Sequence, residues 1–389
     1  MTADVAIIGG GIAGVAAAAH LAAGGSRVVL YEREAIAAGA SGRNSGVVQH
    51  PFDPALVSMY EETLDVYRVL ALELPEAGFR LAREPAGLLL VSRHAGVVGP
   101  LARRIEALFP HLAPTVFEDG DLQVIEPAIG PGVSACRVPI GYPVVPAAPT
   151  YALATLAERR GATIRQGRSA SLVTERGRCT GVRVDGRFEP AGAVVVAAGP
   201  WSPGIIDPSG AWSPIRPLWG VVVETSLAKP PGHVLEEAEM DAALGTGEVA
   251  AEAGVEVGDP ATTPEFSLVT AGGMSSIGST FLEAEPDPRA WTERILRRAT
   301  AFVPALLDAP IRDVRACARP VALDGRPLVG PVPGIAGLFV CAGHGPWGIS
   351  IGPGSARLVA DLVVGQAVVI PAALDPARFG APGSEGSPS

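Results

Sequence analysis

The N-terminal segment contains the feature that most restricts the fold. An apolar run, ADVAII, leads into Gly9, Gly11 and Gly14, a helix of small residues follows, and a second apolar run ends on Glu32. This order and spacing predict a dinucleotide-binding βαβ unit. The first glycine allows a tight turn, the second lets the backbone approach a pyrophosphate, and the third lets the helix pack on the strand. We expect the phosphates to lie at the helix N-terminus and the carboxylate of Glu32 to bind an adenosine ribose.

The loop after this unit indicates which dinucleotide is bound, because a ribose-binding acid serves the adenosine half of both FAD and NAD. Arg33 is followed by AIAAGASGRNSGVVQ, in which Ser41, Asn44, Ser45 and Gly46 place hydrogen-bond donors close together. Such a loop suits a flavin that lies flat on the domain. An NAD-dependent dehydrogenase would leave the loop unexplained.

Three further stretches follow along the chain: VVVAAGPWSPGI (194–205), RPLWGVVVE (216–224) and RACARPVALDGRPLVGPVPGIAGLFVCAGHGPWGISIGPGSARLVADLV (315–363). Together with the N-terminal unit, and in this order, they resemble the D-amino acid oxidase family of FAD-dependent oxidoreductases. That family includes glycine oxidase, sarcosine oxidase and D-amino acid dehydrogenase. The resemblance extends over nearly the whole chain and is more specific than the N-terminal glycines alone.

The resemblance implies an α/β fold with two domains. One is a Rossmann-like FAD-binding domain of the glutathione-reductase type, and the other is an α+β substrate domain built on a mostly antiparallel sheet. The length of 389 residues suffices for two cores, because single hydrophobic cores stop growing at about 250–300 residues. We expect a discontinuous FAD-binding domain of residues 1–85, 145–212 and 315–375, a substrate domain of 86–144 and 213–314, and a flexible tail of 376–389.

By resemblance, the chain binds FAD noncovalently. The C-terminal glycine-rich turn leads into a helix whose N-terminal amides and dipole would face the flavin N1 and C2 carbonyl region, which is anionic when reduced. The expected cofactor-binding residues are Gly9, Gly11, Ile12, Ala13, Gly14, Glu32, Arg33, Ala40, Ser41, Asn44, Ser45, Gly46, Val47, Val173, Ala198, Gly199, Trp201, Gly343, His344, Gly345, Pro346, Trp347, Gly348, Ile349 and Ser350.

The candidate for substrate binding is Arg319, which precedes a proline and the DGRPLVG turn where the family places a carboxylate-binding arginine. A planar guanidinium gives a carboxylate two parallel charge-assisted hydrogen bonds. The competing interpretation is a solvated or ion-paired arginine. His344 and Trp347 are candidates to contact the substrate or oxygen, and a packed aromatic without a chemical role is an equal alternative for Trp347. Cys317 matches the cysteine that sarcosine oxidases link to flavin, but a small buried hydrophobic residue is the favoured interpretation.

The expected reaction is oxidation of the C–N bond of a small amino or imino acid, such as a D-amino acid, glycine or a sarcosine-like N-methyl compound. Hydride passes to flavin N5, and the resulting imine is hydrolysed; with oxygen as acceptor the second product is hydrogen peroxide. The only lysine is Lys229, so the lysine that sarcosine oxidases hold near the flavin has no match, and another electron acceptor stays open. The alternatives are a 2-hydroxy acid oxidase or dehydrogenase and a non-catalytic flavin-bearing subunit.

Composition excludes several other classes. The net charge is −10 and no basic stripe appears, which argues against nucleic acid as a partner. No apolar run reaches about 20 residues and no signal peptide is evident, so we expect a cytoplasmic protein without a transmembrane segment. The four cysteines lack CxxC spacing, so we expect neither a metal site nor disulfides. The acidic, glycine-rich residues 236–264 predict either a lid over the entrance or, with more weight, an inert surface loop. The oligomeric state is left open.

Overall fold

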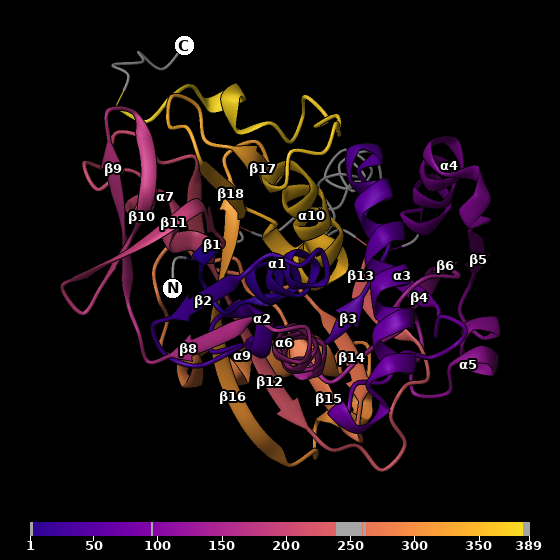
Figure 1. Cartoon of the computed structure of the whole chain (residues 1–389). Helices are drawn as coiled ribbons and strands as arrows, with labels where there is room; N and C mark the ends of the chain where they lie inside the picture. Colours follow the sequence, from indigo (N-terminus) through magenta and orange to yellow (C-terminus); the bar gives the residue numbers. More distant parts are fainter. Residues whose placement is uncertain (1–2, 95, 239–258, 260–261, 384–389) are drawn as a thin grey trace.

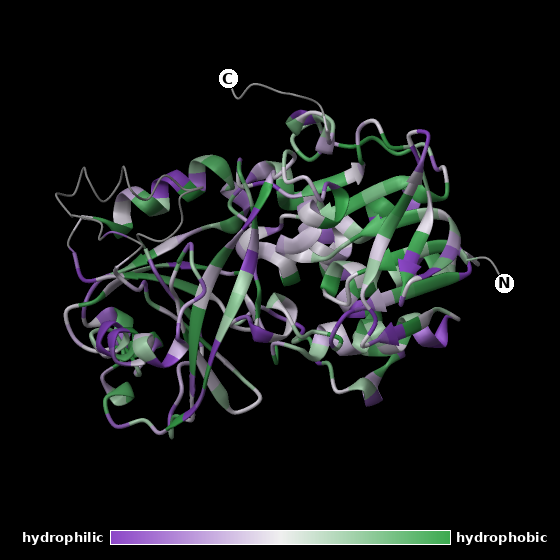
Figure 2. Cartoon of the chain, turned by 90° about the vertical axis from the view of Figure 1, so that its left-hand side faces the viewer, coloured by the Kyte–Doolittle hydropathy of each residue, from purple (hydrophilic) through white to green (hydrophobic). Residues whose placement is uncertain are grey.

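Two eight-stranded sheets form the two halves of the molecule (Figures 1 and 2). The computed structural model describes residues 3–94, 96–238, 259 and 262–383. Segments from the start, middle and end of the chain meet in the first sheet, as the colours of Figure 1 show. The α/β fold class predicted from the sequence is confirmed by this architecture.

The first sheet has the strand order β17-β18-β11-β1-β2-β8, and β10 and β9 extend it from β11. The strands from β18 to β8 are parallel, and β17 is an antiparallel edge strand. Central parallel strands are covered on both faces, which explains why they read as unbroken apolar runs. The bounds are β1 (Ala3–Ile8), β2 (Val28–Glu32), β8 (Thr163–Gln166), β9 (Ala170–Glu175), β10 (Arg178–Val184), β11 (Arg187–Val196), β17 (Leu328–Pro331) and β18 (Leu338–Ala342).

The second sheet has the strand order β16-β12-β15-β14-β13-β4-β6-β5. Its neighbours are antiparallel except for the parallel pair of β13 and β4. A two-stranded ladder, β3 (Val47–Val48) with β7 (Tyr142–Pro143), lies outside both large sheets. The bounds are β4 (Leu88–Ser92), β5 (Thr115–Phe117), β6 (Ser134–Val138), β12 (Ile215–Thr225), β13 (Val234–Glu237), β14 (Ser267–Ala271), β15 (Met274–Gly278) and β16 (Ile311–Ala322).

Helices cover the sheets and complete the cores. In the first half, α1, α3, α6 and α10 share one hydrophobic core, while in the second half α4 and α9 pack on different clusters. The helices are α1 (Ile12–Ala23), α2 (Ala40–Arg43), α3 (Val57–Glu73), α4 (Val98–Leu108), α5 (Asp121–Ile125), α6 (Ala148–Arg159), α7 (Ser202–Ile206), α9 (Pro288–Thr300) and α10 (Gly348–Val363).

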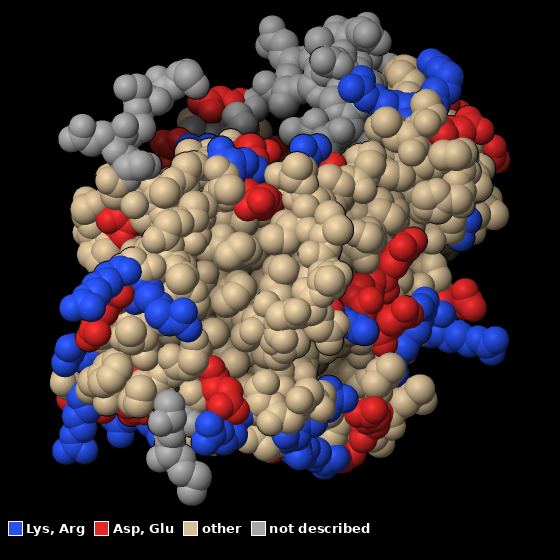
Figure 3. Space-filling model, turned by 45° about the horizontal axis from the view of Figure 1, so that its top comes forward, with Lys and Arg blue, Asp and Glu red and all other residues tan. Residues whose placement is uncertain are grey.

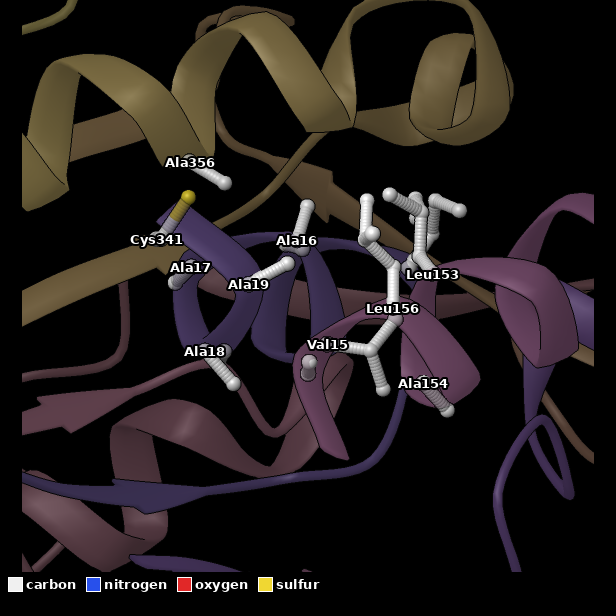
Figure 4. Packing of buried hydrophobic residues seen from close by; sticks show 14 of the residues in the cluster. Val15, Ala16, Ala17, Ala18, Ala19, Leu153, Ala154, Leu156, Cys341 and Ala356 are labelled. Atoms are coloured by element: carbon white, nitrogen blue, oxygen red, sulfur yellow. The ribbon is translucent and has the colours of Figure 1, made fainter. Parts of the chain in front are cut away.

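Small residues let the central helices approach closely. Figure 4 shows the alanines of α1 between Ala356 of α10 and the leucines of α6. A Cβ added at Gly14 of α1 would lie 2.0 Å from the backbone oxygen of Gly9, and one at Gly354 of α10 would lie 2.2 Å from the backbone oxygen of Met59 in α3. Only glycine fits at these two helical positions, because backbone oxygens cannot move aside without shifting a whole element.

Two of the domain boundaries expected from the sequence, at residues 315 and 376, differ from those in the structure. Strand β16 pairs with β12 through Ala322, so residues 315–322 belong to the second sheet rather than to the FAD-binding half. The expected tail begins with an ordered turn at Pro376–Phe379, where Arg378 forms an ion pair with Asp324 at 2.6 Å. Most of the predicted lid or surface loop at 236–264 lies outside the described residues.

Replacing Gly354 by alanine tests the packing of α10 on α3. Alanine normally stabilises an exposed helix position relative to glycine by about 1 kcal/mol. Here we expect Gly354→Ala to destabilise the protein by about 1–3 kcal/mol, because its methyl group would overlap the Met59 carbonyl. Urea unfolding measures the change. Gly204→Ala in α7 is the control, since a Cβ there meets no atom within 4 Å, and equal unfolding midpoints for both variants would contradict the prediction.

Candidate active site

A cavity of about 830 Å³ lies between the two halves. Its wall runs from the glycine turn after β1, along the loop around α2, to β16 of the second sheet and the turn before α10. The predicted residues that line it are Gly9, Gly11, Ile12, Ala13, Glu32, Arg33, Ala40, Ser41, Asn44, Ser45, Gly46, Val47, Ala198, Gly199, Trp201, Arg319, His344, Gly345, Pro346, Gly348 and Ile349.

The other predicted residues lie outside the cavity wall, and each has a structural reason. Gly14 packs against Gly9, and Gly343 has a φ of +88° that suits the turn. Trp347 is partly buried against two hydrophobic clusters, which favours its interpretation as a packed aromatic. The Ser350 hydroxyl accepts a hydrogen bond from a backbone N–H at 3.0 Å. Val173 lies on β9, paired with β10, while Ser169 and Ala170 before it line the wall.

The N-terminus of α1 faces the cavity at one end. Gly9 has a φ of +117°, and a Cβ there would lie 2.4 Å from the backbone oxygen of Ala197, so this turn requires glycine. The Ser41 hydroxyl accepts a hydrogen bond from the Ile12 N–H at 2.9 Å. The turn therefore brings backbone amides and a helix dipole to the cavity, which is the arrangement that binds phosphate groups.

Glu32 lies at the end of β2, beside the glycine turn. Its carboxylate accepts hydrogen bonds from the N–H groups of Gly10 at 2.7 Å and Glu34 at 2.8 Å. Next to it, the Arg33 guanidinium stacks on the indole of Trp201 at 4.1 Å from the ring centre. These three side chains form a polar and aromatic end to the cavity, as expected for the adenosine half of a dinucleotide.

The loop around α2 is shaped by its own side chains. The Asn44 amide donates to the backbone oxygens of Ala40 and Ser41 at 3.2 and 2.9 Å, and its oxygen accepts from the Gly46 N–H at 2.8 Å. Asn44 thus holds the loop, and the loop's backbone and hydroxyl groups line the cavity. Gly46 has a φ of +85°, and a Cβ there would lie 2.3 Å from the backbone oxygen of Val144.

Arg315 connects this loop to the second sheet. From β16, its guanidinium donates to the backbone oxygens of Arg43 and Asn44 at 3.2 and 3.1 Å and forms an ion pair with Glu224 at 2.9 Å. Its side chain is only 13% exposed. The arginine therefore fixes the relative position of the two walls of the cavity.

Arg319 lies four residues beyond Arg315 along β16, on the same face of the strand. Its Nη1 donates to the Thr280 backbone oxygen at 2.8 Å, and its Nη2 donates to the Ser279 hydroxyl. The guanidinium also lies over Gly220, where any Cβ would be 2.3 Å from Nη2. Burial lowers the pKa of Arg319. The ion pairs found among the described residues do not include Arg319, although an arginine is charged at every relevant pH.

Cys317 lines the cavity beside Arg319. All four cysteines are free and buried. Cys317 is 4% exposed, as a small buried hydrophobic residue is expected to be.

His344 precedes the turn into α10 and is 4% exposed. Its Nε2 has no hydrogen-bond partner among the described residues, and burial lowers the pKa of the imidazole to about 4. The ring is therefore neutral near pH 7, and its Nε2 is a buried nitrogen without a partner among the described residues.

Sequence reasoning missed Glu236 in the second wall and Glu265 behind it. Glu236 of β13 lines the cavity and accepts a hydrogen bond from the Gln49 amide at 3.0 Å. Glu265 is hydrogen-bonded through its backbone to Ser279, which holds Arg319. Burial, together with the charge of Glu237, raises the pKa of Glu265 to about 7. These residues belong to segments without a motif, so no local pattern pointed to them.

The volume and the lining of the cavity suit FAD. Its first end offers helix amides to a pyrophosphate, its middle is a loop of small and hydroxyl residues, and its far end meets the N-terminus of α10 at Gly348. Gly9 and Gly46, whose Cβ atoms would overlap backbone oxygens, keep the two turns compact. Ligand cavities of this kind measure about 300–1,000 Å³.

Residues 4–362 match the family model described as FAD dependent oxidoreductase (DAO). The chain belongs to this family. The match confirms the resemblance noted from the sequence, and membership confirms FAD as the cofactor.

Two curated relatives differ in how much they share with the chain. Glycine oxidase of Pseudomonas putida is 25% identical over 99% of this chain and 100% of its own length. D-amino acid dehydrogenase of Cereibacter sphaeroides is 30% identical over 62% of this chain. The chain spans about half the length of that dehydrogenase, 51%.

Solved structures share the fold over nearly their whole length. Glycine oxidase from Geobacillus kaustophilus superposes with a TM-score of 0.80 at 24% identity, covering 97% of this chain and 98% of its own. Iminodiacetate oxidase from Chelativorans sp. BNC1 has a TM-score of 0.76 at 25% identity, with coverage of 96% and 98%.

Two surface features bear on the expected partners. Figure 3 shows basic and acidic side chains in small groups around a broad uncharged area on one face. Among the described helices, none is both long and apolar enough to span a bilayer.

Replacing Arg315 by glutamine tests its link between the two walls. We expect Arg315→Gln to weaken FAD binding about tenfold, which corresponds to about 1.4 kcal/mol, because the loop of Arg43 and Asn44 loses its anchor. Quenching of flavin fluorescence on titration of the apoprotein measures the affinity. Arg312→Gln on the same strand is the control and should bind FAD normally, because Arg312 is exposed and donates a hydrogen bond to the Ser226 hydroxyl rather than to the loop. Unchanged affinity in Arg315→Gln would contradict the inferred link.

Replacing Glu265 by glutamine tests its raised pKa. A carboxyl group with a pKa of about 7 in the folded protein and an ordinary pKa when unfolded binds more protons in the folded state, so its contribution to stability falls as the pH rises between those values. We expect Glu265→Gln to raise the melting temperature clearly at pH 8 and little at pH 5. An equal change at both pH values would contradict the raised pKa.

Proposed function

We propose that the chain oxidises the C–N bond of a small amino or imino acid, with FAD as the hydride acceptor. Arg319 carries the proposal. It is a partly buried arginine that lines the cavity, and none of the ion pairs among the described residues includes it. A partly buried charge without an ion-pair partner is costly, and a substrate carboxylate would supply that partner.

The hydrogen bonds of Arg319 leave room for a carboxylate. An arginine has five N–H groups, and two of them bond to Ser279 and Thr280. These two bonds fix the plane of the guanidinium, so the remaining groups are oriented before a substrate binds. A carboxylate bound by two such groups has a defined direction as well as a position. Arg319 would thereby orient the α-carbon of the substrate.

His344 and the cavity walls contribute orientation and exclude water. His344 lines the cavity with a neutral imidazole. The amine must be neutral to release hydride, and a neutral imidazole adds no repelling charge. FAD, when bound, accepts the hydride and its electron pair. The imine that leaves the substrate site is hydrolysed by water to a carbonyl compound and an amine.

The relatives support an amine rather than a 2-hydroxy acid as substrate, since their names refer to glycine, D-amino acids and iminodiacetate. Release of ammonia or methylamine distinguishes the two reactions, because a hydroxy acid releases neither. Protein-bound flavin that no candidate substrate bleaches would instead indicate a non-catalytic subunit.

The electron acceptor is oxygen or a second compound. Lys229 is the only lysine of the sequence; it is exposed and lies outside the cavity wall. A lysine charge is therefore not available to assist oxygen at the flavin. With oxygen as acceptor the product is hydrogen peroxide, and comparison of peroxide formation with dye reduction measures the preference.

Replacing Arg319 by alanine tests the carboxylate site. We expect the variant to need at least about 100-fold more amino acid for half-maximal bleaching of the flavin under anaerobic conditions, since a charge-assisted bidentate pair contributes about 3 kcal/mol. Arg216→Ala is the control, because Arg216 is exposed and pairs with the exposed Glu283. Unchanged half-saturation in Arg319→Ala, with FAD still bound, would exclude Arg319 as the carboxylate site.

A further inference from the structure

The guanidinium of Arg319 packs against an aromatic ring and a glycine backbone, in addition to forming its two hydrogen bonds. Its Cζ lies over the Phe281 ring, 4.6 Å from the ring centre. A Cβ added at Gly220 would lie 2.3–2.4 Å from Nη1, Nη2 and Cζ, so the guanidinium lies directly against the backbone of β12. Phe281 and Arg319 both line the cavity. These two contacts therefore act on the part of Arg319 that a ligand would meet.

Gly220 is an unexpected residue at its position in β12. The three valines that follow it in the strand are buried, and a glycine inside a strand normally weakens that strand. The backbone of Gly220 has no positive φ that would require glycine. Glycine in a strand often marks a place where another group approaches closely. Here that group is the guanidinium of Arg319.

Phe281 is held in place by its two neighbours in the chain, which bond to β12. The N–H of Trp219 donates to the Leu282 oxygen at 2.7 Å, and the N–H of Leu282 donates to the Trp219 oxygen at 2.9 Å. On the other side of Phe281, the Thr280 hydroxyl accepts from the Val221 N–H at 3.0 Å. The four hydrophobic clusters of the described residues do not include Phe281. Its ring is therefore not accounted for by packing in a core.

We propose that Phe281 and Gly220 are positioning residues of the carboxylate site, which hold the Arg319 guanidinium in the orientation that binds a carboxylate. This inference rests on the proposed function and specifies how its binding site is ordered. The face of an aromatic ring attracts a cation without using its N–H groups, so these groups stay free for a ligand. A guanidinium that is ordered beforehand loses less conformational freedom when a carboxylate binds.

The test measures the binding of three carboxylates without an amine, namely acetate, propionate and benzoate, to the holoprotein through the change in flavin absorbance. We expect Phe281→Leu to raise all three dissociation constants by the same factor, about three- to tenfold, because the three compounds share only the group that binds Arg319. Phe281→Tyr keeps an aromatic face, so its dissociation constants should stay within about twofold of those of the unmodified protein.

Gly220→Ala is the second variant. The atoms nearest to the added methyl group belong to the end of the flexible Arg319 side chain, so the strand keeps its pairing while the guanidinium is displaced. We expect this variant to bind FAD and to bind all three carboxylates at least about tenfold more weakly, because a displaced guanidinium loses its bidentate geometry.

Phe379→Leu is the matched control, because the Phe379 ring also lies 4.6 Å from an arginine, Arg378, but outside the cavity wall. It should leave all three dissociation constants unchanged. A loss in Phe281→Leu that is larger for benzoate than for acetate overturns the inference, since Phe281 would then contact the rest of the ligand. Unchanged affinity in either Phe281→Leu or Gly220→Ala also overturns it. If none of the three carboxylates binds to the unmodified holoprotein, the carboxylate site itself, and with it the proposed function, is contradicted.

Discussion

The close approach of three backbone segments at Gly9, Gly14 and Ala197 is the constraint on which the cavity depends. Side chains at either glycine would overlap backbone oxygens, so α1 begins directly against the ends of β1 and β11. This contact leaves the N–H groups of the first helical turn facing the cavity, where they provide positive partial charge without any basic side chain. The small side chains of the α1 alanines likewise permit a close approach. They bring α10 near enough for its N-terminus to close the far end of the cavity (Figure 4).

The two sheets contribute different chemistry to the one cavity. The first sheet supplies backbone amides, small residues and the Glu32 carboxylate, all of which suit a constant cofactor. The second sheet supplies charged side chains, among them Arg319, which we propose as the binding group for the substrate carboxylate. Arg315 joins the two contributions through its bonds to the loop of the first half and to Glu224 of the second. Specificity can therefore change in the second sheet without altering the cofactor site.

The sequence predicted those parts of the site whose residues are close together in the chain. The spacing of the glycines identified the βαβ unit, and the loop around α2 follows it directly. Arg319 was identified by its position just before the DGRPLVG turn. Gln49 and Glu236 were not, since 187 positions separate two residues that meet only in the folded protein. The expected boundary at residue 315 failed for a related reason: β16 is continuous across it, and its pairing with β12 is decided by a strand about one hundred residues earlier in the chain.

Charged groups around Arg319 link the binding of a substrate to the protonation of Glu265. Glu265 interacts with Arg319, and it is also influenced by Glu237, whose carboxylate is compensated by Arg298 on the α9 face. Glu265 is influenced by both Arg319 and Glu236. When a substrate carboxylate binds Arg319, the attraction that favours ionised Glu265 is partly cancelled, so the pKa of Glu265 should rise further. Because its pKa is already about 7, substrate binding should be accompanied by proton uptake near neutral pH, and by linkage the affinity for the substrate should fall as the pH increases.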